Sequence, residues 1–241
     1  IRCFSRTELV DVANVLLHKE LEGKNIAVVT HAGGPGVMLT DALDKNGLDV
    51  PMIAGDTADE LLSKLFHGSS VANPIDFLAT GTAEQLGIIL DYIDEKFDNI
   101  NGTAVIFGTT GMFDSSPVYD VLSEKMKTLR KPIFPVLPSV VLTKEATEAF
   151  ISKNHSIFTD EVSLGSALAR VYNTAKPAKK EQLPEVDSQK IRNIIEKSEN
   201  GYLQPTDVMA MLDAIGIPHP KEKESENIDE IIAFAEQIGY P

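Results

Sequence analysis

The segment that decides the fold runs from Ile26 to Asp41 and reads Ile-Ala-Val-Val-Thr-His-Ala-Gly-Gly-Pro-Gly-Val-Met-Leu-Thr-Asp. An apolar, β-branched run passes through a glycine-rich turn into the three-to-four-residue spacing of a helix. Gly33, Gly34 and Gly36 let the backbone approach a ligand closely, and the helix start directs free N–H groups and a positive dipole end to the same point. This strand–turn–helix unit predicts a site for a phosphate or a carboxylate.

Strand-like and helical patterns alternate on both sides of this unit, which is typical of a parallel sheet with helices on both faces. We therefore expect a doubly wound α/β domain over residues 1–174, a charged, proline-containing linker over 175–187, and a small helical segment over 188–241. The predicted strands cover residues 26–29, 48–53, 71–78 (strand or loop), 103–107, 132–137 and 156–158. The predicted helices cover residues 34–45, 58–66, 82–97, 117–129, 144–153, 161–174, 188–197, 204–214 and 227–237.

The composition excludes several classes of function. A formal charge of −14 in 241 residues argues against binding to nucleic acid or to an anionic membrane surface. The single cysteine, Cys3, excludes an internal disulfide framework and a cysteine-built metal site, and it favours a reducing cytoplasm. His18, His67, His155 and His219 show no metal-ligand spacing, so no metal site is predicted. We find no signal peptide and no apolar run that would span a bilayer, so no membrane partner is expected.

A second polar turn follows another predicted strand. Gly108, Thr109, Thr110 and Gly111 lie between the strand at 103–107 and the next helix, so in a doubly wound sheet they belong at the same carboxyl edge as the first turn. The segment Asn73-Pro74-Ile75-Asp76 falls at this edge too. We therefore expect the turns to converge on one ligand.

Each feature also has a purely structural interpretation. The first turn lacks the third glycine of the dinucleotide fingerprint and the Lys-Ser/Thr of a P-loop, and such a turn also serves tight strand-to-helix packing. An acidic side chain aimed at an anion is repulsive, so we assign orienting roles to Asp41 and Asp76. Thr40 is assigned an orienting role as well. His31 has no carboxylate in the sequence to orient it as a base, so a hydrogen bond to loop backbone is the better interpretation.

Three stretches carry a resemblance to a known family: 27–37 with Thr40-Asp41, then 73–76, and finally 212–218 with 235–241. They resemble the NDP-forming acyl-CoA synthetases, which include ADP-forming acetyl-CoA synthetase and are related to succinyl-CoA synthetase. In that family a CoA-binding domain and a flavodoxin-like domain with a phosphohistidine precede a second flavodoxin-like domain and an ATP-grasp region. The resemblance identifies this chain as a fragment, with the second flavodoxin-like domain at 1–174, truncated ATP-grasp helices at 188–241, and the end of a preceding linker at Ile1–Leu9.

The resemblance implies a reaction of acyl-CoA, phosphate and ADP that gives acid, CoA and ATP through an acyl phosphate and a phosphohistidine. The full-length enzyme would use CoA, ADP or ATP, and Mg, with no covalent cofactor, and would be a cytoplasmic homo-oligomer that acts on a small acid. Its partner domains carry the reactive histidine and most of the nucleotide site, so the fragment holds no catalytic residue and would be inactive alone. The implied acyl- or phosphate-binding residues are Thr30, His31, Gly33, Gly34, Gly36, Asn73, Gly108, Thr109, Thr110 and Gly111.

Relatives usually carry asparagine where this chain has His31, so acyl specificity or local hydrogen bonding is expected to differ. A non-catalytic ligand-sensing or scaffold module of the same fold, as in fused protein acyltransferases, is the alternative. A nicotinamide-binding dehydrogenase domain is disfavoured by the incomplete glycine fingerprint. The identity of the acid, the choice of ADP or GDP and the oligomeric state stay open from the sequence.

Overall fold

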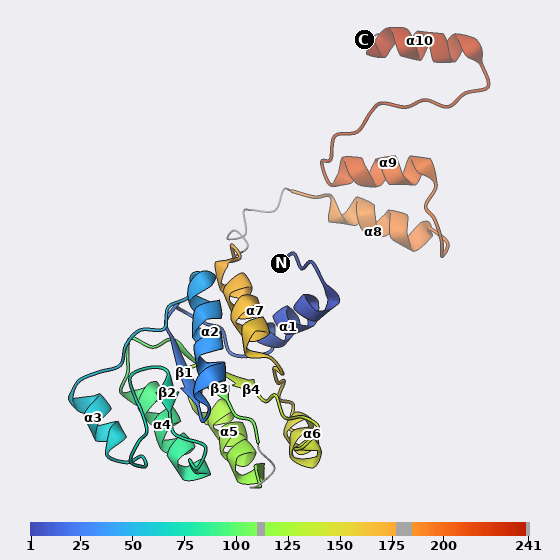
Figure 1. Ribbon diagram of the computed structural model, residues 1–241. Coiled ribbons are helices and arrows are strands. Elements are labelled where there is room, and N and C mark those ends of the chain that lie inside the picture. Colours follow the sequence, from blue (N-terminus) through green and yellow to red (C-terminus); the bar gives the residue numbers. More distant parts are fainter. Residues whose placement is uncertain (110–113, 177–184, 240–241) are drawn as a thin grey trace. The chain divides into compact units, whose positions relative to one another are not determined.

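The computed structural model describes residues 1–109, 114–176 and 185–239, in two compact units, Ile1–Ala175 and Lys176–Pro241. The first unit is built on a parallel sheet (Figure 1). Strand β1 (Ile26–Thr30) lies between β2 (Ile75–Asp76) and β3 (Gly102–Ile106), and β4 (Ile133–Val136) pairs with the far side of β3. All the described strand pairs are parallel, as the alternating pattern predicted.

Helices cover both faces of this sheet, which confirms the predicted doubly wound architecture (Figure 1). Along β1, Ile26 and Val28 enter one apolar core, while Ala27 and Val29 enter the other, because successive strand residues point to opposite faces. One face packs against α1 (Arg6–Leu16), α2 (Gly33–Lys45) and α7 (Glu161–Asn173). The other face packs against α3 (Asp56–Leu62), α4 (Ala83–Glu95), α5 (Ser116–Thr128) and α6 (Lys144–Ser152).

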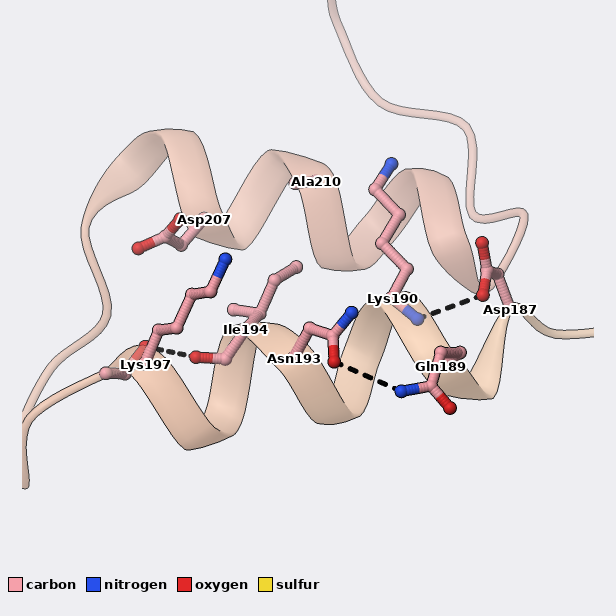
Figure 2. A pocket seen from close by; sticks show the side chains of 9 residues that line it. Asp187, Gln189, Lys190, Asn193, Ile194, Lys197, Asp207 and Ala210 are labelled. Atoms are coloured by element: carbon pink, nitrogen blue, oxygen red, sulfur yellow. Dashed lines mark hydrogen bonds between the residues drawn. The ribbon is translucent and has the colours of Figure 1, made fainter.

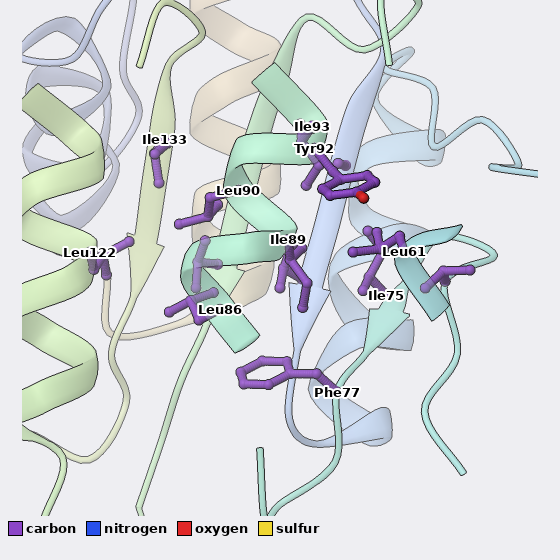
Figure 3. Close-up of a cluster of buried hydrophobic side chains, with 14 of the residues drawn as sticks. Leu61, Ile75, Phe77, Leu86, Ile89, Leu90, Tyr92, Ile93, Leu122 and Ile133 are labelled. Atoms are coloured by element: carbon purple, nitrogen blue, oxygen red, sulfur yellow. The ribbon is translucent and has the colours of Figure 1, made fainter. Parts of the chain in front are cut away.

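The core under α4 shows why these residues fold together (Figure 3). Leu86, Ile89, Leu90 and Ile93 recur at helical spacing and are buried against the sheet, with Phe77 beside them. Burial of each such side chain contributes about 1.5–3 kcal/mol relative to exposure. Two apolar layers thereby hold the sheet between them. The loops that follow β1, β3 and β4 lie at its carboxyl edge, outside these layers.

The predicted strand at 48–53 is wrong. Only Asp49 pairs with the sheet, through an isolated parallel bridge to Asn25, and the chain then turns away. Pro51 has no N–H to donate to a ladder, so a strand that continued along β1 would lack a hydrogen bond there. The predicted strand at 156–158 is likewise reduced to one bridge, between Val136 and Phe158.

Helix α1 was not predicted, and part of it falls in the segment 1–9 that we expected to be a linker. Ser5 caps the helix by accepting a hydrogen bond from the N–H of Glu8, at 3.1 Å. Val12 and Val15 are buried in the core that α7 also lines. The segment therefore belongs to the folded first unit.

The second unit contains α8 (Ser188–Lys197), α9 (Pro205–Ala214) and α10 (Ile228–Ile238), where the sequence predicted its helical segment. Helices α8 and α9 pack against each other, and Ala214 is the only residue of this unit that is buried among those the structure describes. Across the described parts of both units, every helix is too short or too polar to cross a membrane. Most of the predicted linker, residues 177–184, lies outside the described residues.

Candidate functional site

The turns that follow β1 and β3 lie side by side at the carboxyl edge of the sheet, because the two strands are parallel neighbours. The imidazole of His31 joins them. Its Nδ1 lies 3.3 Å from the carbonyl oxygen of Ile106, at the end of β3. Its ring centroid lies 4.5 Å from that of Phe107, and a Cβ placed on Gly108 would lie 3.9 Å from its Cε1. The structure thus brings the two predicted turns together through one side chain.

The contacts of His31 favour the neutral form of its imidazole. A carbonyl oxygen only accepts hydrogen bonds, so the contact with Ile106 puts the ring hydrogen on Nδ1. Burial lowers the pKa of His31, although the hydrogen bond to Ile106 and the charge of Asp76 oppose this shift. The imidazole is therefore uncharged near pH 7. It bonds backbone at the end of β3, next to the loop backbone that the sequence favoured as its partner over a catalytic role.

The start of α2 presents open backbone N–H groups. Thr30 is buried, and its hydroxyl accepts the N–H of Ala32 at 3.0 Å and donates to the Ala32 carbonyl at 2.8 Å. Among the described residues, none accepts a hydrogen bond from the N–H groups of Gly33 and Gly34, although a Cβ on Gly33 would lie 3.8 Å from Oδ2 of Asp76. Thr30 is therefore engaged within the turn, whereas these two glycines carry the donors that an anion would meet.

Gly34 and Gly36 differ in how much space surrounds them. A Cβ on Gly36 would lie 3.0 Å from Cγ2 of Thr30, so Gly36 allows α2 to pack closely on the end of β1. A Cβ on Gly34 would have no atom within 4 Å. Packing therefore requires glycine at position 36 but leaves position 34 unconstrained.

Asn73 supports β1 in place of a regular strand. Its Oδ1 accepts the N–H of Val28 at 2.9 Å, and its Nδ2 donates to the carbonyls of Ile26 and Pro51 at 3.0 and 2.9 Å. Both amide hydrogens are thereby used within the chain, which argues against the ligand contact predicted for this side chain. Asn73 instead supplies the ladder contacts that the missing strand would have made.

Thr40, Asp41 and Asp76, which were predicted to orient the site, differ in the contacts that they make. Asp76 accepts the N–H of Leu78 at 2.9 Å, and the hydroxyl of Thr40 donates to the Gly36 carbonyl at 2.9 Å. Asp41 is exposed, and no other described residue pairs with it. Only Asp76 and Thr40 therefore make contacts of an orienting kind.

The second turn is held by a residue that the sequence analysis did not identify. The N–H of Thr109 donates to Oγ of Ser139 at 2.9 Å, and a Cβ on Gly108 would lie 3.1 Å from the same oxygen. Ser139 follows β4 at the same edge of the sheet, and this position was the available signal for it. The predicted site residues Thr110 and Gly111 lie outside the described residues.

A hollow of about 350 Å³ opens beside this turn, where α5 and α6 begin. Thr109, Ser115 and Lys144 line it together with the carboxylates of Asp114 and Glu145. Ser115 is 6% exposed, and no other described residue bonds its hydroxyl. The hydroxyl and N–H of Ser116 lower the pKa of Asp114, which keeps that carboxylate charged. Charges of both signs line this hollow, whereas the start of α2 presents two N–H groups without an acceptor among the described residues, so the start of α2 is the stronger candidate for an anion.

A larger hollow, of about 600 Å³, lies elsewhere, between α8 and α9 (Figure 2). Lys190 and Lys197 extend from α8 toward α9, which bears Asp207. The two lysines are exposed and Asp207 is half-buried, and the three side chains do not converge on one point. Its size alone therefore does not make it the functional site. Within the described ranges, no group of three or more His, Cys, Asp or Glu residues is placed to hold a metal ion.

Comparisons with known proteins point to one kind of enzyme, although no protein-family profile matches the chain. Acetate–CoA ligase (ADP-forming) I of Archaeoglobus fulgidus is 28% identical over 248 residues, which cover 100% of this chain and 35% of the relative. 4-Hydroxybutyrate–CoA ligase (ADP-forming) of Nitrosopumilus maritimus is 24% identical over 251 residues, with the same two coverages. The chain thus spans about a third of the length of these relatives, and the predicted resemblance to NDP-forming acyl-CoA synthetases is confirmed.

A solved structure shares the fold. Dinucleotide forming acetyl-coenzyme A synthetase 1 of Ca. Korarchaeum cryptofilum superposes with a TM-score of 0.62 at 20% identity. The match covers 70% of this chain and 38% of that one. This agreement supports the predicted fold class.

Proposed function

We propose that this chain, as a relative of the ADP-forming acid–CoA ligases, is the part of such a ligase that holds the acyl or phosphate group during transfer. Two observations support the proposal. The similarity to these ligases extends along the whole chain. The start of α2 offers the unpaired N–H groups of Gly33 and Gly34 at the sheet edge where His31 meets the second turn, and this arrangement carries the proposal.

The chemistry needs such an arrangement. Conversion of acyl-CoA and phosphate to an acyl phosphate, and transfer of that phosphoryl group to a histidine and then to ADP, places negative charge on oxygens at each stage. Backbone N–H groups fixed at a helix start stabilise this charge without reorganising. His31, being neutral, neither neutralises nor repels the anion. The phospho-acceptor histidine and most of the nucleotide site, with its Mg²⁺, would belong to other domains.

The surface around the turns supports a neighbouring domain as partner. Val37 and Met38, in the first turns of α2, are 58% and 51% exposed. Val141 and Leu142 border the hollow at the second turn and are also largely exposed. Apolar side chains that ring a polar site are typical of a surface covered by another domain. We therefore place the phosphohistidine domain of the full-length, cytoplasmic enzyme against this edge, and we expect a homo-oligomer.

The test is the reaction of the full-length protein with acetyl-CoA, phosphate and ADP as probe substrates. ATP formation together with a phosphorylated histidine supports the proposal. A full-length protein that binds acetate or phosphate but forms neither ATP nor phosphohistidine with any short acyl-CoA would instead be the ligand-sensing or scaffold module.

A further inference from the structure

A third and smaller hollow lies at the opposite edge of the sheet, near the amino end of β4. It measures about 220 Å³ and is lined by the end of the α1 segment, by α5, by the first residues of β4 and by the loop after α6. Two histidines, His18 and His155, line it. Neither takes part in the proposed transfer site, so their arrangement needs another explanation.

His18 fastens the end of α1 to the sheet. Its Nδ1 lies 2.8 Å from the carbonyl oxygen of Asn14, in the last turn of the helix. Its ring centroid lies 5.1 Å from that of Phe134 on β4 and 5.9 Å from that of Phe158. Asn14 adds a longer hydrogen bond, from Nδ2 to the carbonyl of Ile157 at 3.4 Å. The imidazole of His18 therefore joins the end of α1 to β4, beside the buried side chain of Val15.

The geometry accommodates only the neutral imidazole. Because the Asn14 carbonyl accepts from Nδ1, the neutral ring carries its hydrogen there and leaves Nε2 bare. Nε2 is buried, and among the described residues it has no hydrogen-bond partner. Protonation would add a hydrogen to this buried nitrogen with no acceptor among the described residues in reach, which carries a free-energy cost.

The groups that face His18 add no compensating negative charge. Its own segment brings Lys19, whose ammonium donates to the carbonyl of Leu129, and the loop after α6 brings His155 and Lys153. Helix α5 brings Lys127 and the uncharged Met126. The first residues of β4 bring no titratable group. Nε2 of His155 is paired with Oγ of Ser123 at 2.8 Å, and the ammonium of Lys153 pairs with Asp120 at 2.7 Å.

We propose that His18 is a pH-sensitive fastening that holds the end of α1 on the sheet when its imidazole is neutral and releases it when the imidazole becomes protonated. Burial lowers the pKa of His18, the hydrogen bond to Asn14 opposes this shift, and the charge of His155 adds to it. The attachment is therefore complete above the ordinary histidine pKa of about 6.5 and weakens as pH falls from there toward the lowered value. This device lies outside the proposed acyl or phosphate site and does not depend on it.

Hydrogen exchange of the α1 amides in the full chain, corrected for intrinsic rates, tests the proposal between about pH 8 and pH 5.5. In the open state, in which α1 is detached, His18 would have the ordinary histidine pKa of about 6.5. The population of this state should therefore be up to about tenfold higher at about pH 5.5 than at about pH 8, and exchange through α1 opening should rise by the same factor. His18→Asn keeps a donor for the Asn14 carbonyl but cannot titrate, so its opening should not depend on pH. His67→Asn, at an exposed histidine, is the matched control and should behave like the wild type.

Two further measurements keep the test decisive. His155→Asn removes a neighbour that becomes positively charged as the pH falls, which eases protonation of His18 in the folded state and should reduce the rise. If His18→Asn does not fold, an NMR titration of the His18 ring in the wild-type chain replaces it, and a pKa at or above 6.5 overturns the proposal. Opening that is independent of pH in the wild type, retained pH dependence in His18→Asn, or an equal rise over the whole first unit also overturns it.

Discussion

Substitution of Gly34 by leucine should impair anion binding at the first turn without destabilising the domain. Position 34 is exposed, and a Cβ there would meet no atom within 4 Å. Replacing a helical glycine whose backbone conformation suits other residues raises the free energy of unfolding by about 0.4–1 kcal/mol, so the domain should be as stable as the wild type or more stable. The leucine side chain would nevertheless occupy the space that an anion needs in front of the N–H groups of Gly33 and Gly34.

The loss of function can be estimated from the same contacts. One hydrogen bond to a charged group contributes about 1.5–3 kcal/mol, so loss of one N–H contact in Gly34→Leu should weaken acyl or phosphate binding about 10- to 150-fold. Acid–CoA ligation by the full-length protein should fall accordingly, while phosphorylation of the upstream histidine by ATP continues. Wild-type ligation, or equal loss of ligation and phosphorylation, would refute the reasoning.

Gly36→Ala is the matched control. Its methyl group would lie 3.0 Å from Cγ2 of Thr30, tighter than most carbon contacts, and crowding of this kind costs about 1–3 kcal/mol of unfolding free energy. Urea denaturation should therefore show a lower midpoint for Gly36→Ala and not for Gly34→Leu. Ligation per folded molecule should show the reverse order, because Gly36 supports the packing of α2 and Gly34 presents the donors.

Other substitutions test single contacts of the first unit. Asn73→Asp keeps the acceptor for Val28 but sets a carboxylate against two carbonyl oxygens, so urea denaturation should show a loss of about 2–4 kcal/mol, and an unchanged midpoint would contradict its supporting role. The hydrogen bond to Glu60 raises the pKa of Tyr92 to about 12, so this contact stabilises the fold below the ordinary tyrosine pKa and is lost as pH rises from about 10 to 12. An ultraviolet titration should lose its latest tyrosinate step in Tyr92→Phe, and a step that persists would refute the assignment. His31→Asn should retain turnover because an amide can also donate to the end of β3, and complete loss of phosphoenzyme would show that the imidazole itself reacts.

The sequence predicted the sheet well where burial alone decides the structure. The runs at β1, β3 and β4 are apolar because both faces of each strand are covered, and this pattern is visible without knowledge of their neighbours. The segment 48–53 shows the same apolar pattern but does not form a strand. In the structure, one bridge at Asp49 and the side chain of Asn73 make the contacts that such a strand would have made. These contacts join residues more than 20 positions apart, so a local sequence pattern does not predict them.

The site was predictable to the extent that it depends on backbone. The glycine spacing indicated which turns lie at the carboxyl edge, but it did not distinguish Gly36, which packs, from Gly34, which is open. Ser139 and Ser115 could not be identified, because their roles depend on how the loops after β3 and β4 meet. Helix α1 was missed because exposed Leu9 and Val10 obscure the spacing of its buried residues.

Crystals of the full chain soaked with inorganic phosphate and acetate provide the most direct test of the central claim. The account predicts density within hydrogen-bond distance of the N–H groups of Gly33 and Gly34, beside His31 and the turn at Gly108. Density confined to the hollow at Lys144 or to the groove between α8 and α9, with the start of α2 empty, would contradict it.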